Sequence, residues 1–294
     1  MSTPRFLTLP PGVTPRRIET SRGIFAVLEA LPGSGVVERC PALLVPGLTG
    51  SKEDFLAVLQ TLAHSGRRVV AMDLRGQYET PGPDDPAAYT CAALGADVDA
   101  LAETIGGSEP VHLVGHSFGG LVARAAAIDG RARLASLTLM STGPTGITGR
   151  RAEGGKKIIE EIGQFGLEHL WHSRFEPEAV ANGVPDEIVA FLRKRLLSNS
   201  PTGLGVMAEQ CLCIDDRTEQ LRQAGVPVLV LFGEHDDGWP PQVQRQTARR
   251  LEAECVVVPG AVHSPAVEAP ETTAAALVRF WNEAEALDAK SKEV

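Results

Sequence analysis

Residues 111–128, VHLVGHSFGGLVARAAAI, decide the fold of this chain. The first part is a continuous apolar run, which is typical of a buried strand, and the last part has the apolar spacing of a helix. Between them lies the pentapeptide G-x-S-x-G at residues 115–119. So tight a turn requires small residues two positions before and two positions after Ser117, and it presents the serine hydroxyl above the sheet. The stretch therefore predicts a strand, a sharp turn carrying a nucleophilic serine, and a helix.

The same alternation of strand and helix patterns continues on both sides. Apolar runs bounded by turn residues predict strands at residues 23–30, 41–45, 68–73, 111–115, 134–140, 227–233 and 255–259. Helical spacing predicts helices at residues 54–64, 90–105, 120–128, 242–251 and 271–286. Strands that are apolar throughout and separated by amphipathic helices indicate a parallel sheet covered on both faces. We predict an α/β fold with a doubly wound, mostly parallel sheet of about seven or eight strands.

One interval breaks this alternation. Residues 145–224 contain helical patterns at 155–171, 185–197 and 203–213 but no strand pattern. A helical block between two strands is expected to cover the carboxyl ends of the sheet, where open α/β sheets bind ligands. We expect residues 1–144 and 225–294 to form the sheet domain, and residues 145–224 to form an inserted helical cap.

Composition narrows the class of protein. The 294 residues include 28 Lys and Arg against 37 Asp and Glu, which gives a net charge of −9. This acidic balance disfavours nucleic acid and anionic membrane surfaces as partners, and no apolar run reaches membrane-spanning length. Five cysteines, an odd number without zinc-site spacing, favour reduced thiols over disulfides or a metal site. We expect a cytoplasmic enzyme, monomeric or homodimeric, that acts on a small molecule without a metal or other cofactor.

Two further residues extend the site around the serine. A serine hydroxyl needs a base to become a nucleophile, and the base needs an acid that fixes its tautomer. Asp236 follows the predicted strand 227–233, and His263 follows the predicted strand 255–259. Nucleophile, acid and base thus occur in the order Ser, Asp, His at three strand ends. Asp237 is an alternative acid, and a structural serine in a glycine-rich turn is the alternative interpretation of Ser117.

With these segments, the chain resembles the α/β-hydrolase superfamily, in the branch of esterase-like and cofactor-free haloperoxidase-like enzymes with a helical cap. The matching segments are LLVPGLTGS (43–51), AMDLRG (71–76), VGHSFGG (114–120), PVLVLFGEHD (227–236) and VPGAVHSPAVEAPE (258–271). The resemblance implies that Ser117 is the nucleophile, His263 the general base and later acid, and Asp236 its orienting partner. It also implies an oxyanion hole formed by the main-chain N–H groups of Leu48 and Phe118.

Two loops depart from the family's pattern. Family members often have His-Gly in the loop before the first oxyanion donor, whereas this chain has Pro46-Gly47. They commonly have Gly-His-Gly-x-Ser in a second loop, whereas this chain has Gly-Gln-Tyr-Glu-Thr at residues 76–80. We expect the second loop to follow a different path, because Tyr78 is too bulky for a conformation reserved for glycine.

The cap is expected to supply an apolar pocket over the serine. Trp171, Met207 and Trp239 are candidate pocket residues. His116 is expected to brace the turn rather than to react. A basic cluster at the start of the cap is either a solvated helix end or a site that attracts an anionic substrate; its members are Arg150, Arg151, Lys156 and Lys157.

These features predict a serine hydrolase that forms an acyl-enzyme with a carboxylic ester, lactone or thioester whose acyl group is largely apolar. The superfamily also hosts C–C bond hydrolysis, lyase steps and perhydrolysis on the same triad, so these reactions are alternatives. A ligand receptor that retains the triad is the alternative from another class. A serine at position 117 argues against the related reactions in which a carboxylate attacks.

Overall fold

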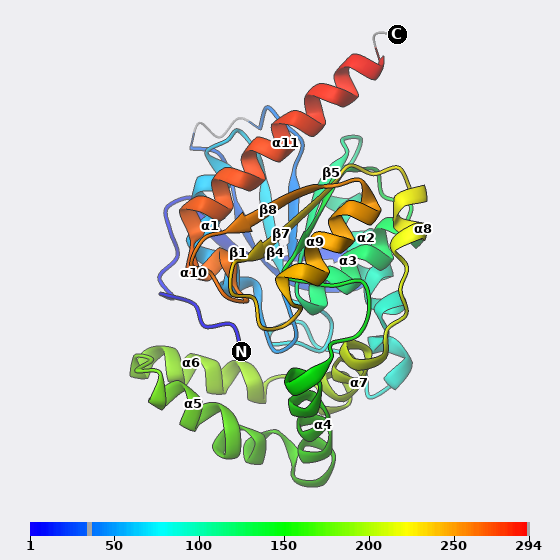
Figure 1. The fold of residues 1–294 in the computed structure, drawn as a ribbon. Coiled ribbons are helices and arrows are strands. Elements are labelled where there is room, and N and C mark those ends of the chain that lie inside the picture. The colour runs from blue at the N-terminus through cyan, green and yellow to red at the C-terminus, as the bar shows by residue number, and fades with distance from the viewer. Residues whose placement is uncertain (34–36, 293–294) are drawn as a thin grey trace.

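The computed structural model describes residues 1–33 and 37–292, which contain an eight-stranded sheet with helices on both faces (Figure 1). The strands are β1 (Val13–Thr20), β2 (Gly23–Ala30), β3 (Ala42–Val45), β4 (Val69–Met72), β5 (Val111–His116), β6 (Leu134–Met140), β7 (Val228–Gly233) and β8 (Glu254–Val258). Their order across the sheet is β1-β2-β4-β3-β5-β6-β7-β8. Strand β2 runs antiparallel to both neighbours, and the other pairs are parallel. The predicted doubly wound, mostly parallel sheet is confirmed.

Helices cover the two faces of this sheet. The elements outside the interval between β6 and β7 are η1 (Lys52–Phe55), α1 (Leu56–Ala63), η2 (Pro86–Tyr89), α2 (Cys91–Gly106), α3 (Phe118–Asp129), α9 (Pro241–Leu251), α10 (Pro265–Glu268) and α11 (Pro270–Lys292). Helices α2, α3 and α9 pack their apolar side chains on one face, and α1 and α11 pack on the other. Burial on both faces explains why the central strands are largely apolar.

All seven predicted strands are present, and the structure adds β1. Strand β1 lies at one edge of the sheet and pairs only with β2. It carries Pro15, Arg16 and Arg17 at exposed positions. An edge strand tolerates proline and charged residues because one side of its backbone makes no ladder hydrogen bonds. For the same reason it lacks the apolar pattern from which the other strands are predicted.

Between β6 and β7, every regular element in the described chain is helical. These elements are α4 (Gly149–Leu170), the π-helix η3 (Trp171–Phe175), α5 (Glu176–Ala181), α6 (Asp186–Leu197), α7 (Pro201–Cys213) and α8 (Thr218–Gln223). Helices α4 to α7 gather at one end of the sheet (Figure 1). Helix α8 packs instead on α3 and α9. Residues 145–224 were expected to form the cap, but this interval also contains α8, which packs on helices that cover the sheet.

None of the helices in the described part of the chain combines the length and the apolar character needed to cross a bilayer.

A polar cluster fastens the long C-terminal helix α11 to the sheet. Oε1 of Glu285 lies 3.1 Å from Nε2 of His112 in β5, and it accepts a hydrogen bond from Arg67 at 2.9 Å. Burial favours a raised pKa for Glu285, but the contacts with His112 and Arg67 outweigh it and lower the pKa to about 2.

Replacing Glu285 by Gln is expected to lower the free energy of unfolding at pH 7 by about 1–2 kcal/mol. Because the pKa of Glu285 is lower in the folded than in the unfolded chain, its stabilisation is complete above about pH 5 and is lost as the pH falls toward 2. Urea midpoints of wild type and Glu285→Gln should therefore differ most at pH 7 and converge toward pH 3. A difference that stays constant across this range would contradict a charge-based role.

Candidate active site

Ser117 occupies a strained turn between β5 and α3, with φ of 54° and ψ of −119°. This left-handed region is uncommon for residues that carry a side chain. The surrounding main chain leaves no space for larger neighbours. A Cβ on Gly115 would lie 2.3 Å from the carbonyl oxygen of Gly119, and a Cβ on Gly119 would lie 2.3 Å from the carbonyl oxygen of Pro46. The predicted need for small residues on both sides of Ser117 is confirmed.

His263 connects Ser117 to Asp236. Nε2 of His263 lies 2.9 Å from Oγ of Ser117, and Nδ1 of His263 lies 2.8 Å from Oδ1 of Asp236. The three residues come directly or shortly after β5, β8 and β7, so the carboxyl ends of parallel strands bring them together. The structure thus assembles a continuous hydrogen-bonded chain from three segments that are far apart in sequence.

Asp236 is held in place and kept ionised by its surroundings. The residue is only 4% exposed. Its Oδ1 also accepts the main-chain N–H of Gly238 at 2.8 Å, and its Oδ2 accepts the side-chain amide of Gln244 at 2.8 Å. Burial favours a raised pKa, but the hydrogen bonds from His263, Gln244 and Gly238 outweigh it and hold the pKa of Asp236 below its usual range. Asp237, the alternative acid, instead pairs with Arg151 of α4.

His116, the residue before the nucleophile, contacts the loop that carries His263. Its Nε2 donates a hydrogen bond to the main-chain oxygen of His263 at 2.7 Å. Burial, together with the nearby His263 ring, lowers the pKa of His116 to about 4, so its imidazole is neutral at pH 7. This contact places His116 as a brace between the elbow and the histidine loop, as the sequence predicts.

Leu48 and Phe118 flank Ser117 from two directions. Leu48 lies in the loop after β3 and lines the cavity above Ser117, and Phe118 is the first residue of α3. The preceding Gly47 packs tightly on the nucleophile, because a Cβ at this position would lie 3.1 Å from Cβ of Ser117. The loop carrying Leu48 is therefore positioned by direct contact with the serine.

Gln77 braces this loop from behind, and sequence reasoning missed it. Its Oε1 accepts the main-chain N–H of Thr49 at 2.7 Å, and its Nε2 donates to the carbonyl oxygen of Gly47 at 3.3 Å. The side chain is fully buried, and Thr49 has a positive φ of 60°. The available signal was that Gln77 lies in a loop that departs from the family's pattern.

Tyr78 was expected to be too bulky for a backbone conformation that favours glycine. In the structure it has a φ of 44°, which lies in that left-handed region. Its ring packs edge-on against Phe191 of α6 at a centroid distance of 5.6 Å, and Nζ of Lys52 lies 4.5 Å from the ring centroid. Tyr78 therefore adopts the conformation that was expected to exclude it, because contacts with Phe191 and Lys52 hold the strained residue.

A cavity of about 740 Å³ lies over Ser117, between the sheet and the helices inserted after β6. Ser117 and His263 form part of its wall, together with the loop that carries Leu48. Apolar side chains contributed mainly by the inserted segment supply much of the remaining wall; they include Ile147, Ile158, Ile162, Leu170, Phe175 and Leu204. The arrangement places Ser117 and His263 at one wall of a largely apolar cavity.

The predicted pocket residues are wrong. The structure describes Trp171, Met207 and Trp239, and none of the three lines this cavity. Trp171 is buried in the apolar core of the cap, and Met207 is buried against the core on the α2 and α3 face. Trp239 is also buried, and its Nε1 donates to the carbonyl oxygen of Thr145 at 2.9 Å. Residue type identified these side chains as apolar, but the packing of the helices decided which way they point.

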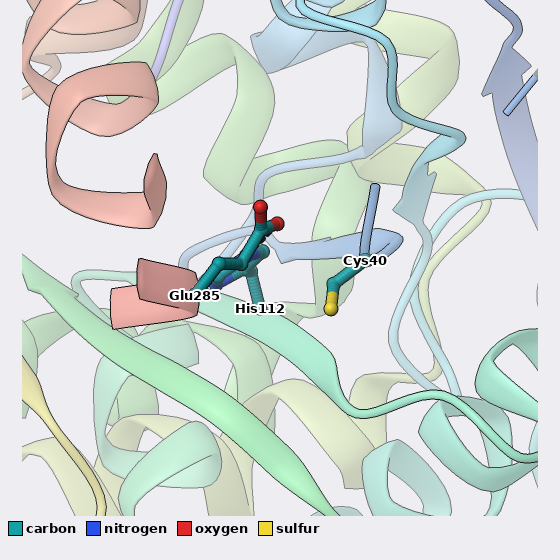
Figure 2. Close-up of side chains that lie close together, drawn as sticks. All are labelled: Cys40, His112 and Glu285. Carbon is teal, nitrogen blue, oxygen red and sulfur yellow. Dashed lines mark hydrogen bonds and ion pairs between the residues drawn. The ribbon is translucent and has the colours of Figure 1, made fainter. Parts of the chain in front are cut away.

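Two groups of side chains in the described chain have donors close enough together to surround a metal ion. Cys40, His112 and Glu285 lie together where the C-terminal half of α11 meets the sheet (Figure 2). The Glu285 oxygens already accept Arg67 and Arg39, and burial raises the pKa of Cys40 to about 11, so its sulfur stays protonated. These contacts make the group a junction between α11 and the sheet.

The second group consists of Asp236, Asp237 and His263. His263 and Gln244 engage the two oxygens of Asp236, and Arg151 pairs with Asp237. Each carboxylate and imidazole of both groups therefore has a partner within the protein. All five cysteines of the described chain are free thiols.

Ser117, His263 and Asp236 are linked by hydrogen bonds at the ends of parallel strands, and helices are inserted between β6 and β7. This arrangement is typical of the α/β-hydrolase fold class. The chain belongs to the alpha/beta hydrolase family, whose model matches residues 42–276. The resemblance recognised in the sequence is thereby confirmed.

Matches to individual proteins are either short or of low sequence identity. The chain is 39% identical over 99 residues to "Putative carbamate hydrolase RutD" of Variovorax paradoxus (strain S110), a match that covers 34% of this chain and 36% of that protein. It is 27% identical over 267 residues to "Putative 2-succinyl-6-hydroxy-2,4-cyclohexadiene-1-carboxylate synthase" of Bacillus subtilis (strain 168), covering 86% and 93% of the two chains. A thermophilic esterase from Thermogutta terrifontis has a similar structure, with a TM-score of 0.71 at 27% identity, covering 92% of this chain and 99% of that chain.

Replacing His116 by Leu is expected to lower the free energy of unfolding by about 1–3 kcal/mol, because the carbonyl of His263 loses its donor. The histidine loop should also exchange its amide hydrogens faster at residues 261–264. Thermal unfolding and hydrogen exchange measure the two effects, with the exposed His64→Leu as the matched control. An unchanged exchange rate in this loop would show that His116 does not brace it.

Proposed function

We propose that this chain is a serine hydrolase that cleaves a carboxylic ester, lactone or thioester through an acyl-enzyme. The observation that supports it is the hydrogen-bonded chain from Ser117 through His263 to Asp236, which opens into a largely apolar cavity. A structural serine would not require a strained backbone, a base within hydrogen-bond distance and an ionised partner for that base.

In the first half of the reaction, Oγ of Ser117 attacks the carbonyl carbon and its proton passes to Nε2 of His263. Asp236, ionised and bonded to Nδ1, stabilises the imidazolium that forms. The main-chain N–H groups of Leu48 and Phe118 stabilise the negative charge on the carbonyl oxygen. The imidazolium then protonates the leaving group, and the carbon–oxygen or carbon–sulfur bond breaks to leave the acyl group on Ser117.

In the second half, His263 takes a proton from a water molecule, whose oxygen attacks the acyl carbon. The tetrahedral intermediate collapses when Ser117 leaves and takes back the proton from His263, which releases the carboxylic acid. Asp236 stays ionised throughout, because its hydrogen bonds hold its pKa below the usual range. The residues of the chain supply every proton transfer in this cycle.

The cavity supports a small-molecule substrate with an apolar acyl group. Its wall includes Ile158, Ile162 and Phe175 from the cap, so an acyl chain would be buried against aliphatic and aromatic side chains. We further propose that α4 to α7 act as the cap, with α8 belonging to the sheet domain, on which it packs. We also propose that the protein functions as a monomer or homodimer and needs no cofactor.

A lyase step on the same triad is the second candidate. It is favoured by the match to the Bacillus subtilis protein named a synthase, which covers 86% of this chain. The two candidates differ in their products, because hydrolysis consumes one water per turnover and a lyase step consumes none. Product analysis in ¹⁸O-labelled water distinguishes them, since only hydrolysis places the label in the released acid.

The variant Ser117→Ala is expected to lose at least about a thousandfold in kcat on p-nitrophenyl esters, because the acyl-enzyme cannot form. A fluorophosphonate should label the wild type at one site per chain and leave Ser117→Ala unlabelled. The exposed Ser198→Ala serves as the control and should retain both turnover and labelling. Equal turnover by Ser117→Ala and wild type would refute the proposed function, and labelling without turnover would support a receptor instead.

The variant Gln77→Leu is expected to lower kcat about 10- to 100-fold and to change KM by less than about threefold, because the loop bearing Leu48 loses its brace. Steady-state kinetics on a p-nitrophenyl ester measure both constants. Gln77→Glu keeps the acceptor for Thr49 but loses the donor to Gly47, so it should fall between Gln77→Leu and wild type. A control is Gln60→Leu, whose amide contacts Pro11 in the N-terminal segment. A twofold or smaller loss in Gln77→Leu would contradict this positioning role.

A further inference from the structure

Arg174 is a cation in the wall of the cavity, and its hydrogen bonding is incomplete. Nη2 of Arg174 lies 3.5 Å from Oε1 of Glu161, at the limit of hydrogen bonding. Its Nε is buried and has no partner among the described residues. No hydrogen bond joins its Nη1 to the described residues, and Nη1 is not fully buried, so this donor is open to a ligand in the cavity.

The backbone around Arg174 is also unusual. The residue lies in the π-helix η3 (Trp171–Phe175), next to Phe175, which lines the same cavity. Such π-helical turns are rare and occur frequently at functional sites. The extra residue in the turn changes the direction of the side chains that follow it. The side chain of Arg174 is 29% exposed, and the residue lines the cavity.

The helix opposite Arg174 leaves room beside the guanidinium. Gly154 and Gly155 of α4 both line the cavity. A Cβ built on Gly154 would lie 3.8 Å from Nη1 of Arg174, so the guanidinium rests over a position that has no side chain. Ile158 and Ile162 follow on the same helix and also line the cavity. A ligand would therefore meet aliphatic side chains beside a single cation.

Most other charged groups of the cavity wall have partners. Asp54 accepts the buried Arg195 at 2.7 Å, and Arg151 pairs with Asp237. Glu268 accepts the main-chain N–H groups of residues 262 and 264. These contacts compensate the charges concerned, so they do not compete for an anionic ligand.

The remaining charged groups to consider are two glutamates, Glu178 and Glu161, and the basic cluster at the start of α4. Glu178 lines the cavity from an exposed position. Glu161 also accepts the hydroxyl of Ser173 at 2.9 Å. Of the basic cluster in the sequence, Lys156 and Lys157 are exposed, and the side chain of Arg150 lies outside the described residues. Arg174 is thus a cation of this wall whose Nη1 has no hydrogen-bond partner among the described residues.

We propose, resting on the serine hydrolase function above, that Arg174 binds a carboxylate at the far end of the acyl chain. The substrate class is then the half-ester, thioester or lactone of a dicarboxylic acid. The carboxylate would accept N–H groups from the two terminal nitrogens of the guanidinium side by side, a paired geometry in which arginine binds carboxylates strongly. The methylene groups would lie along the isoleucines of α4, and the scissile carbonyl would lie at Ser117.

The test compares esters that differ only in the far end of the acyl chain. The p-nitrophenyl half-esters of adipic and suberic acid are paired with p-nitrophenyl hexanoate and octanoate, which carry a methyl group in place of the carboxylate. Wild type is expected to show at least about tenfold higher kcat/KM on one of the half-esters than on its neutral partner. Arg174→Met should lose this preference while its kcat/KM on the neutral esters stays within about threefold of wild type.

Three controls separate binding from folding. Arg193→Met removes an exposed arginine of α6 that pairs with Glu168, and it should leave the preference unchanged. Arg174→Lys keeps the charge without the paired donors, so its preference should lie between wild type and Arg174→Met. Fluorophosphonate labelling of Arg174→Met should proceed at the wild-type rate, which shows that the serine site is intact.

Each outcome separates the two proposals. Equal rates on half-esters and neutral esters in wild type overturn the carboxylate site and leave the serine hydrolase function standing. A loss of activity on both kinds of ester in Arg174→Met also overturns it, because Arg174 would then support the cap. Failure of wild type to turn over any ester or to react with the fluorophosphonate would refute the hydrolase function itself.

Discussion

The crossing of α3 over β5 at Ser117 is the constraint on which the rest of the site depends. Only glycine fits at positions 115 and 119, because the main chain of the turn and of the loop after β3 approaches within 2.3 Å of a Cβ at either position. The same crowding holds Ser117 in a left-handed conformation and brings Gly47 against its Cβ. The strain is sustained because β5 is hydrogen-bonded on both sides, to β3 and to β6.

Polar contacts then orient the reactive groups on this rigid base. His116 ties the histidine loop to the elbow, Gln77 ties the loop bearing Leu48 to the loop after β4, and Gln244 holds the second oxygen of Asp236. Each is a buried side chain that satisfies main-chain or carboxylate partners. In the function we propose, these contacts fix donors and acceptors before a substrate arrives, which is the condition for electrostatic stabilisation of a developing charge.

The sheet and the helices inserted between β6 and β7 supply different parts of the site. Strand ends and the loops that follow them supply Ser117, Asp236 and His263. The inserted helices supply most of the apolar wall and Arg174, and in the function we propose they act as a cap that selects the substrate. The buried pair of Arg195 in α6 and Asp54 in η1 joins the two parts beside the cavity. Loss of either partner would leave an uncompensated buried charge.

The sequence by itself determined the sheet, the elbow and the order of Ser117, Asp236 and His263, because apolar runs, glycine requirements and strand ends are local features. It did not reveal β1, whose edge position removes the apolar pattern, or Gln77, whose role depends on two main-chain groups of a distant loop. It left Asp236 and Asp237 open until the structure directed one to His263 and the other to Arg151. The cavity residues were likewise decided only by tertiary structure, because the direction of a side chain depends on how helices pack, whereas sequence periodicity shows only that the side chain is apolar.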